Sequence, residues 1–263
     1  GRTTEVIMKP ILVDLGIFAL PSYGFMLALG VVIAFAWCFR RASVAGLNAE
    51  RMVDLVSVLM IAALIGARAG YVILNWSYYA SNFWEALRIW EGGLSFHGGL
   101  IAGILAAAVC LHNKEDFLQY SDLLAPGTAL GYAITRIGCF LNGCCYGKPT
   151  DLPWHVHMHA ADRHPVQIYS SLLSLALIPL LLWVDRRKRY TGQVIIYYIM
   201  LYSLERFFVE IYRAGESAVV LSFGLTQAQA LSLVLVIATL TADAVLRRRV
   251  RLNAEASTGV GEG

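Results

Sequence analysis

The stretch Ile17–Phe39, IFALPSYGFMLALGVVIAFAWCF, contains no charged residue and is long enough to cross the hydrocarbon layer of a bilayer as one helix. Of all 263 residues 58% are apolar and only 15% are charged, whereas a typical soluble domain has roughly 25% charged residues. Five cysteines are too few and too unevenly spaced for a disulfide framework. A net charge of +3 argues against a basic nucleic-acid binder, so we expect no nucleic acid among the partners. The composition predicts a polytopic membrane protein.

Six further apolar stretches follow, which together predict an all-α membrane protein with seven transmembrane helices. After the first stretch, the predicted spans are Met52–Leu74, Leu94–Leu111, Ser121–Phe140, Val166–Trp183, Gln193–Tyr212 and Gln227–Leu246. They form one transmembrane domain, residues 17–246, with a longer outer loop at 142–165. Residues 1–16 form an outer segment before it, and a basic cytoplasmic tail, 247–263, follows it. Because its end from Asn253 is small and polar, we expect that end to be disordered.

The distribution of basic residues predicts the orientation in the membrane. Of the 21 lysines and arginines, twelve fall in loops on one side, six on the other, and three within spans. The positive-inside rule places the side with twelve in the cytoplasm, so the N-terminus lies outside and the C-terminus inside. The segment Trp76–Trp90 contains six aromatic residues and is predicted to lie in the outer membrane interface.

Three arginines, Arg68, Arg136 and Arg206, fall inside predicted spans. An arginine at the centre of a membrane helix costs roughly 2.5–3.5 kcal/mol, so each needs a partner, a wet cavity or a ligand. In the predicted orientation the three lie about 20–24 Å from the inner boundary, and Tyr23 and His97 lie about 5–9 Å below the outer surface. Residues from five helices are therefore expected to converge in the outer third of the bilayer, at the height of phospholipid headgroups.

The sixth span carries a run of polar residues on one helical face. Tyr202, Arg206, Glu210 and Arg213 follow at spacings of four, four and three residues, and Glu205 lies in the same span. For Arg206 and Glu210 alone, a purely structural ion pair is an equally good interpretation.

His97 opens the third span in the sequence FHGGL, Phe96–Leu100. A lone histidine near an interface is more often structural than functional. Gly98 and Gly99, however, remove side chains from the helix beside it and permit close approach by a neighbouring helix or a lipid. Similar small-residue packing is indicated by the pairs Gly99–Gly103 and Gly127–Gly131.

Arginines, a histidine and a tyrosine at headgroup height indicate an anionic headgroup as ligand, with phosphate as the group bound. A static phosphate site does not need His97, but a reaction at the phosphate ester does use an imidazole, which accepts a proton near neutral pH. From these residues alone, the sequence indicates phospholipid binding at the outer leaflet and leaves chemical transformation of the lipid open.

Cysteine and histidine gather around the predicted outer loop: Cys139, Cys144, Cys145, His155, His157, His159 and His164. In an extended segment, the alternating histidines 155, 157 and 159 would align on one side. Because no C-x-x-C pair occurs, a zinc or copper site is weakly indicated, and we expect no metal and no cofactor. The preferred interpretation is a polar loop with buried or disulfide-linked cysteines. A Cys144 nucleophile is the alternative, without a base next to it in the sequence.

Six stretches resemble, in order, the motifs of prolipoprotein diacylglyceryl transferases, the first enzymes of bacterial lipoprotein maturation. They are Tyr23-Gly24, Gly66-Ala-Arg68-x-x-Tyr71, Phe96–Gly103 (FHGGLIAG), Arg136–Gly147 (RIGCFLNGCCYG), Arg163–Tyr169 (RHPVQIY) and Tyr202-x3-Arg206-x3-Glu210-x2-Arg213. The resemblance runs from about Pro21 to Leu233. At three positions the chain differs from many family members: Cys139 stands for Asn, Cys144 for Glu, and Ser170 for an acidic residue.

The resemblance implies a multi-pass enzyme of the bacterial cytoplasmic (inner) membrane with its active site towards the periplasmic, outer leaflet. Such enzymes transfer the diacylglyceryl group of phosphatidylglycerol, drawn from the membrane lipids, to the lipobox cysteine of prolipoprotein signal peptides and release glycerol phosphate. Catalytic roles are expected for His97, Arg136 and Arg206. We expect substrate-binding roles for Tyr23, Arg68, Gly98, Gly99, Asn142, Gly147, Tyr202, Glu210 and Arg213.

The implied reaction is a displacement by the substrate thiolate at the glycerol carbon that bears the phosphate. His97 is the candidate base, and Arg136 and Arg206 are the candidates that stabilise the leaving phosphate. The alternative role for Arg68 is to support these residues without contacting the phosphate itself. Two other functions stay open: a catalytically silent phospholipid-binding homologue, and a lipid or anion transporter.

Overall fold

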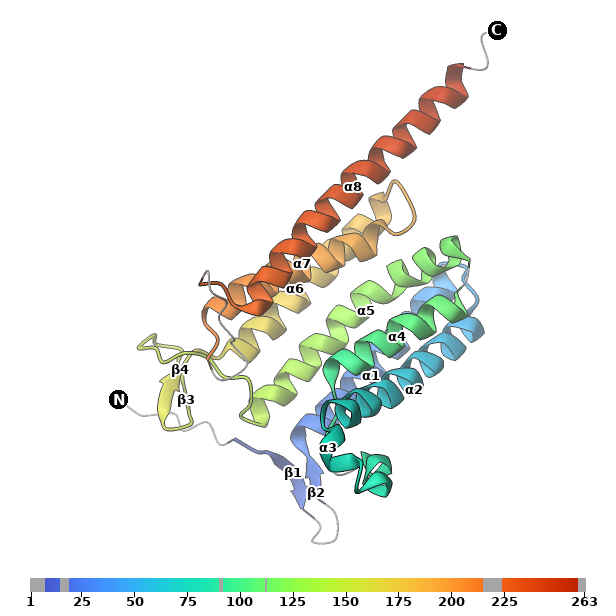
Figure 1. Ribbon diagram of the computed structural model, residues 1–263. Coiled ribbons are helices and arrows are strands. Elements are labelled where there is room, and N and C mark those ends of the chain that lie inside the picture. The colour runs from blue at the N-terminus through green and yellow to red at the C-terminus, as the bar shows by residue number, and fades with distance from the viewer. Residues whose placement is uncertain (1–7, 15–18, 90–91, 112, 215–223, 260–263) are drawn as a thin grey trace. The chain divides into compact units, whose positions relative to one another are not determined.

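The computed structural model describes residues 8–14, 19–89, 92–111, 113–214 and 224–259, which are mainly α-helical (Figure 1). The chain divides into two compact units. One unit combines Gly1–Cys38 with Ser121–Gly263, and the other is Phe39–Tyr120. We refer to them as the large unit and the small unit.

A helix occupies each of the seven predicted stretches. The long helices are α1 (Ser22–Val44), α2 (Ala49–Leu74), α4 (Phe96–Cys110), α5 (Lys114–Leu141), α6 (Val166–Arg187), α7 (Gln193–Ile211) and α8 (Gln227–Gly259). In the aromatic segment lie the short helix α3 (Trp76–Tyr79) and the 3₁₀ helix η1 (Phe83–Leu87). Two antiparallel hairpins complete the described elements: β1 (Ile11–Asp14) with β2 (Ala19–Pro21), and β3 (Val156–Met158) with β4 (Ala161–Arg163).

In the described part of the chain, four helices are long and apolar enough to cross a membrane: α1, α2, α6 and the Gln227–Glu255 part of α8. Helix α4 is apolar, but its 15 residues rise only about 22 Å, less than the roughly 30 Å of a hydrocarbon core. Helices α5 and α7 carry several charged residues each. The chain is thus a multi-pass helical membrane protein, whereas seven spans and their orientation stay predictions.

The first helix begins later than the sequence predicted. Residues Ala19–Pro21, placed in the first span, form strand β2, which pairs with β1. The physical reason is Pro21, because a proline drives the residue before it towards extended backbone. The helix starts at Ser22, whose backbone N–H donates to the Pro10 carbonyl at 2.8 Å. Ile17 lies outside the described residues.

The last helix is longer than predicted. Helix α8 continues to Gly259, so the disorder expected from Asn253 is wrong up to that residue, and residues 260–263 lie outside the described part. An exposed ion pair between Arg251 and Glu255, at 2.7 Å, links successive turns of this extension. Ion pairs at this spacing stabilise a polar helix that has no apolar face to bury.

In the small unit, α2 and α4 lie side by side and approach closely at facing glycines (Figure 1). A Cβ atom on Gly66 would lie 2.6 Å from the Gly98 carbonyl oxygen, and one on Gly98 would meet the Gly66 carbonyl. Gly99 faces the Ala63 carbonyl, whereas a Cβ on Gly103 meets no atom within 4 Å. The predicted close approach is confirmed at Gly98 and Gly99 with α2 as the neighbour, but Gly103 takes no part in it.

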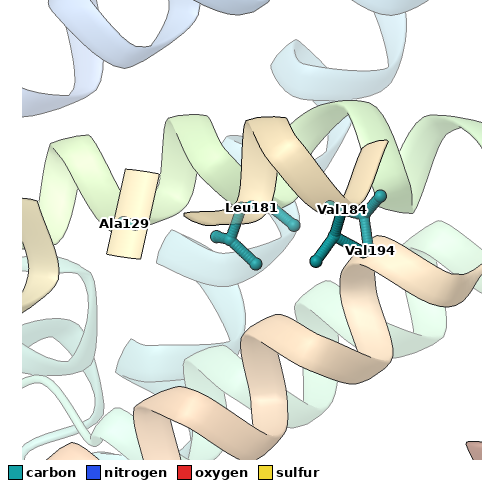
Figure 2. Close-up of a cluster of buried hydrophobic side chains, with 5 residues drawn as sticks. Ala129, Leu181, Val184 and Val194 are labelled. Atoms are coloured by element: carbon teal, nitrogen blue, oxygen red, sulfur yellow. The ribbon is translucent and has the colours of Figure 1, made fainter. Parts of the chain in front are cut away.

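In the large unit, the apolar core lies between α5, α6 and α7 (Figure 2). Its buried members are Ala125, Ala129, Leu181, Val184 and Val194. At one end of this core the Asp122 carboxylate accepts hydrogen bonds from the backbone N–H groups of Gly192, at 2.8 Å, and Ile195, at 3.0 Å. Asp122 therefore caps the N-terminus of α7 from the neighbouring helix α5.

Helix α1 packs on α5 through small residues. A Cβ on Gly30 would lie 2.8 Å from the Gly131 carbonyl oxygen, and one on Gly127 would meet the Cys38 sulfur. The predicted packing at Gly127 and Gly131 is confirmed. Further along, Gly138 lies against the backbone of Tyr23, so the start of α1 is held against the last turns of α5.

We predict that Gly66→Ala lowers the thermal unfolding midpoint in detergent, since the new methyl overpacks the α2–α4 contact by about 1–3 kcal/mol. The matched control is Gly103→Ala, which has open space and is expected to leave the midpoint unchanged or to raise it, because alanine favours a helix by about 1 kcal/mol. Equal midpoints for the two variants, measured by circular dichroism, contradict the described packing.

Candidate functional site

Arg136 is buried on α5 and is oriented by a tyrosine one turn earlier. Its Nε donates a hydrogen bond to the Tyr132 hydroxyl at 2.8 Å, and its guanidinium carbon lies 5.0 Å from the centre of the same ring. Tyr132 in turn meets Tyr202 of α7 edge to face, with ring centres 5.2 Å apart. Among the described residues, neither terminal nitrogen of Arg136 has a hydrogen-bond partner. Two charged donors are therefore available to an anion.

Helix α7 places two carboxylates next to these groups. Arg206 Nη1 lies 2.6 Å from Oε2 of Glu210, whose side chain is fully buried. Glu205 is also buried and accepts a hydrogen bond from Ser174 of α6 at 2.7 Å. Of the four residues predicted to share one face, Tyr202, Arg206 and Glu210 lie on α7 at helical spacing. The prediction is wrong for Arg213, because the helix ends at Ile211.

Tyr23 lies at the start of α1, in contact with Gly138 of α5. Its side chain is partly exposed. Tyr23 and Arg136 belong to the same unit, and their convergence around one ligand stays a prediction.

Three cysteines meet where α5 ends. The Sγ atoms of Cys139, Cys144 and Cys145 all lie within 4.8 Å of one another, and all three are free thiols. Cys139 is buried, as expected, but the alternative of disulfide linkage is wrong for these residues. Cys145 lies in the loop after α5. Hydrogen bonding from the Cys139 and Cys144 thiols lowers the pKa of its thiol, and the guanidinium groups of Arg213 and Arg136 lower it further by attracting the thiolate.

The loop after α5 is fixed to the end of α7. Gly147 and Arg213 form an isolated antiparallel bridge, and the Lys148 backbone N–H donates to the Tyr212 carbonyl at 2.8 Å. A Cβ on Gly147 would collide with the His164 carbonyl, so only glycine fits this position without displacement. Here Gly147 allows close backbone packing, and Arg213 is held beside the cysteines. Asn142 lies in the same turn, where its side chain interacts with the Cys144 thiol.

The loop histidines do not align as predicted. His157 contacts the Asp162 carboxylate at 2.9 Å, and His155 lies 3.6 Å from the same group. His159 has a positive φ of 52° in the β3–β4 turn and its Nε2 lies 2.7 Å from the Gly143 carbonyl. The alignment fails because the extended segment ends at Met158, before the third histidine.

Arg68 and His97 belong to the small unit. The Arg68 guanidinium donates to the carbonyl oxygens of Glu85, Ala86, Gly92 and Gly93 at 2.6–3.0 Å, so all three of its nitrogens are used. Arg68 therefore ties the aromatic segment, and the glycines that follow it, to α2. Trp76 and Trp84 of that segment are exposed, and Trp90 lies outside the described residues.

His97 lies in the first turn of α4 with an exposed side chain. The turn is capped by Ser95, whose hydroxyl accepts a hydrogen bond from the Gly98 N–H at 3.3 Å. Gly98 and Gly99 pack against α2, as described above. They bring this first turn close to Arg68's helix.

The predicted site residues fall into two groups. The large unit holds Tyr23, Arg136, Asn142, Gly147, Tyr202, Arg206, Glu210 and Arg213. The small unit holds Arg68, His97, Gly98 and Gly99. Sequence reasoning missed Tyr132 and Ser174, although the i, i+4 spacing of Tyr132 and Arg136 was a usable signal. Convergence of the two groups stays a prediction.

Apolar helices of membrane-spanning length, together with arginines and carboxylates buried among them, define a multi-pass membrane protein with a polar, arginine-containing site. The chain belongs to the prolipoprotein diacylglyceryl transferase family, whose profile matches residues 10–244. The resemblance seen in the sequence is thereby confirmed.

Two relatives illustrate the similarity. A protein of Clostridioides difficile is 36% identical over 233 residues, which cover 88% of this chain and 92% of the relative. One of Geobacter sulfurreducens is 35% identical over 251 residues, which cover 92% and 96% respectively. Both relatives are named phosphatidylglycerol–prolipoprotein diacylglyceryl transferase.

We predict that Arg206→Gln destabilises the protein by about 3–5 kcal/mol, because it leaves Glu210 charged and buried without a cation. The double variant Arg206→Gln/Glu210→Gln should recover most of this loss. Arg251→Gln, which breaks an exposed pair of the same spacing, is the matched control and should change the unfolding midpoint little. A double variant no more stable than Arg206→Gln in thermal unfolding argues against a buried pair.

Proposed function

We propose that this chain transfers the diacylglyceryl group of phosphatidylglycerol to the lipobox cysteine thiol of prolipoproteins and releases glycerol phosphate. Membership of the family and the names of the relatives support this activity. The observation that carries the proposal is the buried Arg136 guanidinium, whose terminal nitrogens have no partner among the described residues. A charge held in this way in an apolar helix bundle calls for an anionic ligand.

In the proposed reaction the substrate thiol loses its proton and its sulfur attacks the glycerol carbon that bears the phosphate. The carbon–sulfur bond forms as the carbon–oxygen bond breaks, and the electron pair leaves on the phosphate oxygen. Negative charge therefore builds up on the leaving group in the transition state. Fixed cationic donors in a poorly hydrated site stabilise such charge better than water does.

Arg136 is the residue proposed to bind the lipid phosphate. Its Nε is held by Tyr132, which fixes the plane of the guanidinium and leaves the two terminal nitrogens for a bidentate contact. Arg206 adds a second positive charge. Its pairing with Glu210 positions it, and Tyr202 helps to hold Tyr132. Arg213 and Tyr23 complete the proposed phosphate environment.

His97 is the proposed base for the substrate thiol. Its exposed position in the first turn of α4 suits contact with a substrate that enters from the membrane. Gly98 and Gly99 contribute by holding this turn on α2, and we propose that a lipid chain passes beside them. Arg68 acts behind His97 by fixing the segment that precedes α4. The proposal requires the two units to bring His97 close to Arg136.

The same proposal includes the membrane arrangement. We place seven spans in the bacterial cytoplasmic membrane, with the N-terminus outside and the site towards the outer leaflet. The excess of basic residues in the loops assigned to the cytoplasmic side supports this orientation. Asn142 and Gly147 then lie in an outer loop that the lipobox segment can approach. Neither alternative, a silent homologue or a transporter, is favoured by a feature of the described residues.

We predict that Arg136→Ala or His97→Asn lowers the transfer rate at least about 100-fold, since a charged donor or a base typically contributes that much. The measurement is the mass gain of a lipobox peptide incubated with the protein in phosphatidylglycerol vesicles. The control variant Arg249→Ala removes one exposed arginine in the C-terminal part of α8. This variant should transfer the lipid at the wild-type rate.

Folding of each variant is checked by its unfolding midpoint. Wild-type transfer by a folded Arg136→Ala variant contradicts the role of the phosphate contact. An inactive wild-type protein that still binds phosphatidylglycerol identifies a silent homologue instead.

A further inference from the structure

The proposed reaction makes no use of the cluster formed by Cys139, Cys144 and Cys145. Their three sulfur atoms lie within 4.8 Å of one another and none is in a disulfide. Three thiolates around an ion at a metal–sulfur distance of about 2.3 Å are separated by about 3.8–4.0 Å. The cluster therefore needs only small side-chain movements to enclose one ion.

The backbone assembles this cluster from residues that do not form a metal motif in the sequence. Cys139 lies in the last turns of α5, and the Cys144 N–H donates to its carbonyl at 3.1 Å. The chain turns back through two positive φ angles, 70° at Gly143 and 60° at Cys145. A positive φ is unfavourable for a residue with a side chain, yet here it places the Cys145 sulfur beside the other two.

The surroundings fix the cluster and offer further soft or polar atoms. Gln167 is almost completely buried and its Nε2 donates to the Cys144 carbonyl at 2.8 Å. Its Oε1 is buried and has no hydrogen-bond partner among the described residues. The buried Met158 sulfur lies 3.9 Å from the Gln167 nitrogen. Gln167 is therefore bonded to the backbone of the cluster and has one buried acceptor without a partner, which a water ligand of a bound ion would satisfy.

The charges nearby suit an anionic metal–thiolate group. Three thiolates around a divalent ion carry one net negative charge, and around a monovalent ion two. Arg136 and Arg213 both interact electrostatically with Cys145, so their guanidinium groups offset that charge.

We propose that Cys139, Cys144 and Cys145 form a binding site for one thiophilic d10 metal ion, Zn²⁺ or Cu⁺, with their three thiolates as ligands. Soft sulfur ligands select such ions over Mg²⁺ or Ca²⁺. The bound ion links the end of α5, one turn after Arg136, to the loop that packs on α6 and α7. This proposal departs from the expectation of no metal drawn from the sequence spacing, and it does not depend on the proposed transferase activity.

The test is a metal titration of the full chain, purified in detergent and reduced with a phosphine under anaerobic conditions. Zn²⁺ and Cu⁺ are added in separate experiments, each against a competing chelator, and bound metal is counted by elemental analysis. The expected result is one ion per chain in at least one arm, with sulfur neighbours at about 2.3 Å in X-ray absorption. The arm that binds identifies the ion.

Variants assign the ligands. Cys139→Ser, Cys144→Ser and Cys145→Ser should each weaken binding at least about 10-fold, as loss of a metal ligand or its support does. Cys110→Ser, which changes a thiol of α4 outside the cluster, should bind like the wild type. Because a serine variant in a tight turn can fail to fold, alkylation of the wild-type protein gives a second measurement. Metal should protect the three clustered thiols and leave Cys110 reactive.

Any one of three results from the titration, the variants and the alkylation overturns the proposal. They are no binding of either ion by the reduced wild-type chain, binding that survives all three serine variants, and alkylation of the cluster that metal does not slow. A disulfide between two of the three cysteines in the isolated protein that persists under the reducing conditions also overturns it, since the oxidised sulfurs cannot act as thiolate ligands.

Discussion

A guanidinium group inside an apolar helix bundle must have a partner, and the structure is organised around three such groups. Arg68, Arg136 and Arg206 are largely buried, but each is satisfied differently. All three guanidinium nitrogens of Arg68 donate hydrogen bonds to backbone carbonyls, and Arg206 forms an ion pair with the buried carboxylate of Glu210. Within the described part of the chain, Arg136 makes a single hydrogen bond, from its Nε to the Tyr132 hydroxyl. Protein groups thus offset the energetic cost of burial for Arg68 and Arg206, whereas the terminal nitrogens of Arg136 have no hydrogen-bond partner among the described residues.

This difference separates supporting residues from residues that face a substrate. An arginine whose donors are all used can shape a site but cannot also bind a phosphate without giving up those contacts. An arginine with two donors left in a fixed plane is prepared for a bidentate anion. Sequence position alone assigned the three arginines similar depths, and only their contacts distinguish them. The family to which the chain belongs is named for the transfer of a diacylglyceryl group to prolipoproteins.

The helices were predictable because membrane helices follow from the length of apolar stretches, and every predicted stretch contains a helix. Errors occurred at the ends, where local chemistry decides. Pro21 explains why α1 starts later than predicted. An ion pair at i, i+4 spacing stabilises the part of α8 that continues beyond its apolar stretch. Charged helices such as α5 and α7 show why span number is harder to establish. Their buried polar residues lower the apolar signal in the helices that carry the site.

Parts of the site followed from spacing, and parts did not. Tyr202, Arg206 and Glu210 share a helical face because they are spaced four residues apart, and this spacing can be read from the sequence. The meeting of Cys139 with Cys144 and Cys145 depends on two left-handed backbone positions after α5, which no thiol spacing rule encodes. Partners from other helices, such as Ser174 for Glu205, are tertiary contacts, and local sequence spacing does not predict them either.

The most direct test of the central claim is the distance between the Arg136 guanidinium carbon and a lipid phosphorus. It can be measured by ¹³C–³¹P dipolar recoupling in solid-state NMR, with guanidino-labelled arginine in the protein and phosphatidylglycerol as the bilayer lipid. Subtracting the spectrum of the Arg136→Lys variant isolates the signal of this residue. The account predicts a separation of about 4 Å, as in a bidentate arginine–phosphate pair. An Arg136 signal that shows no coupling to phosphorus contradicts it.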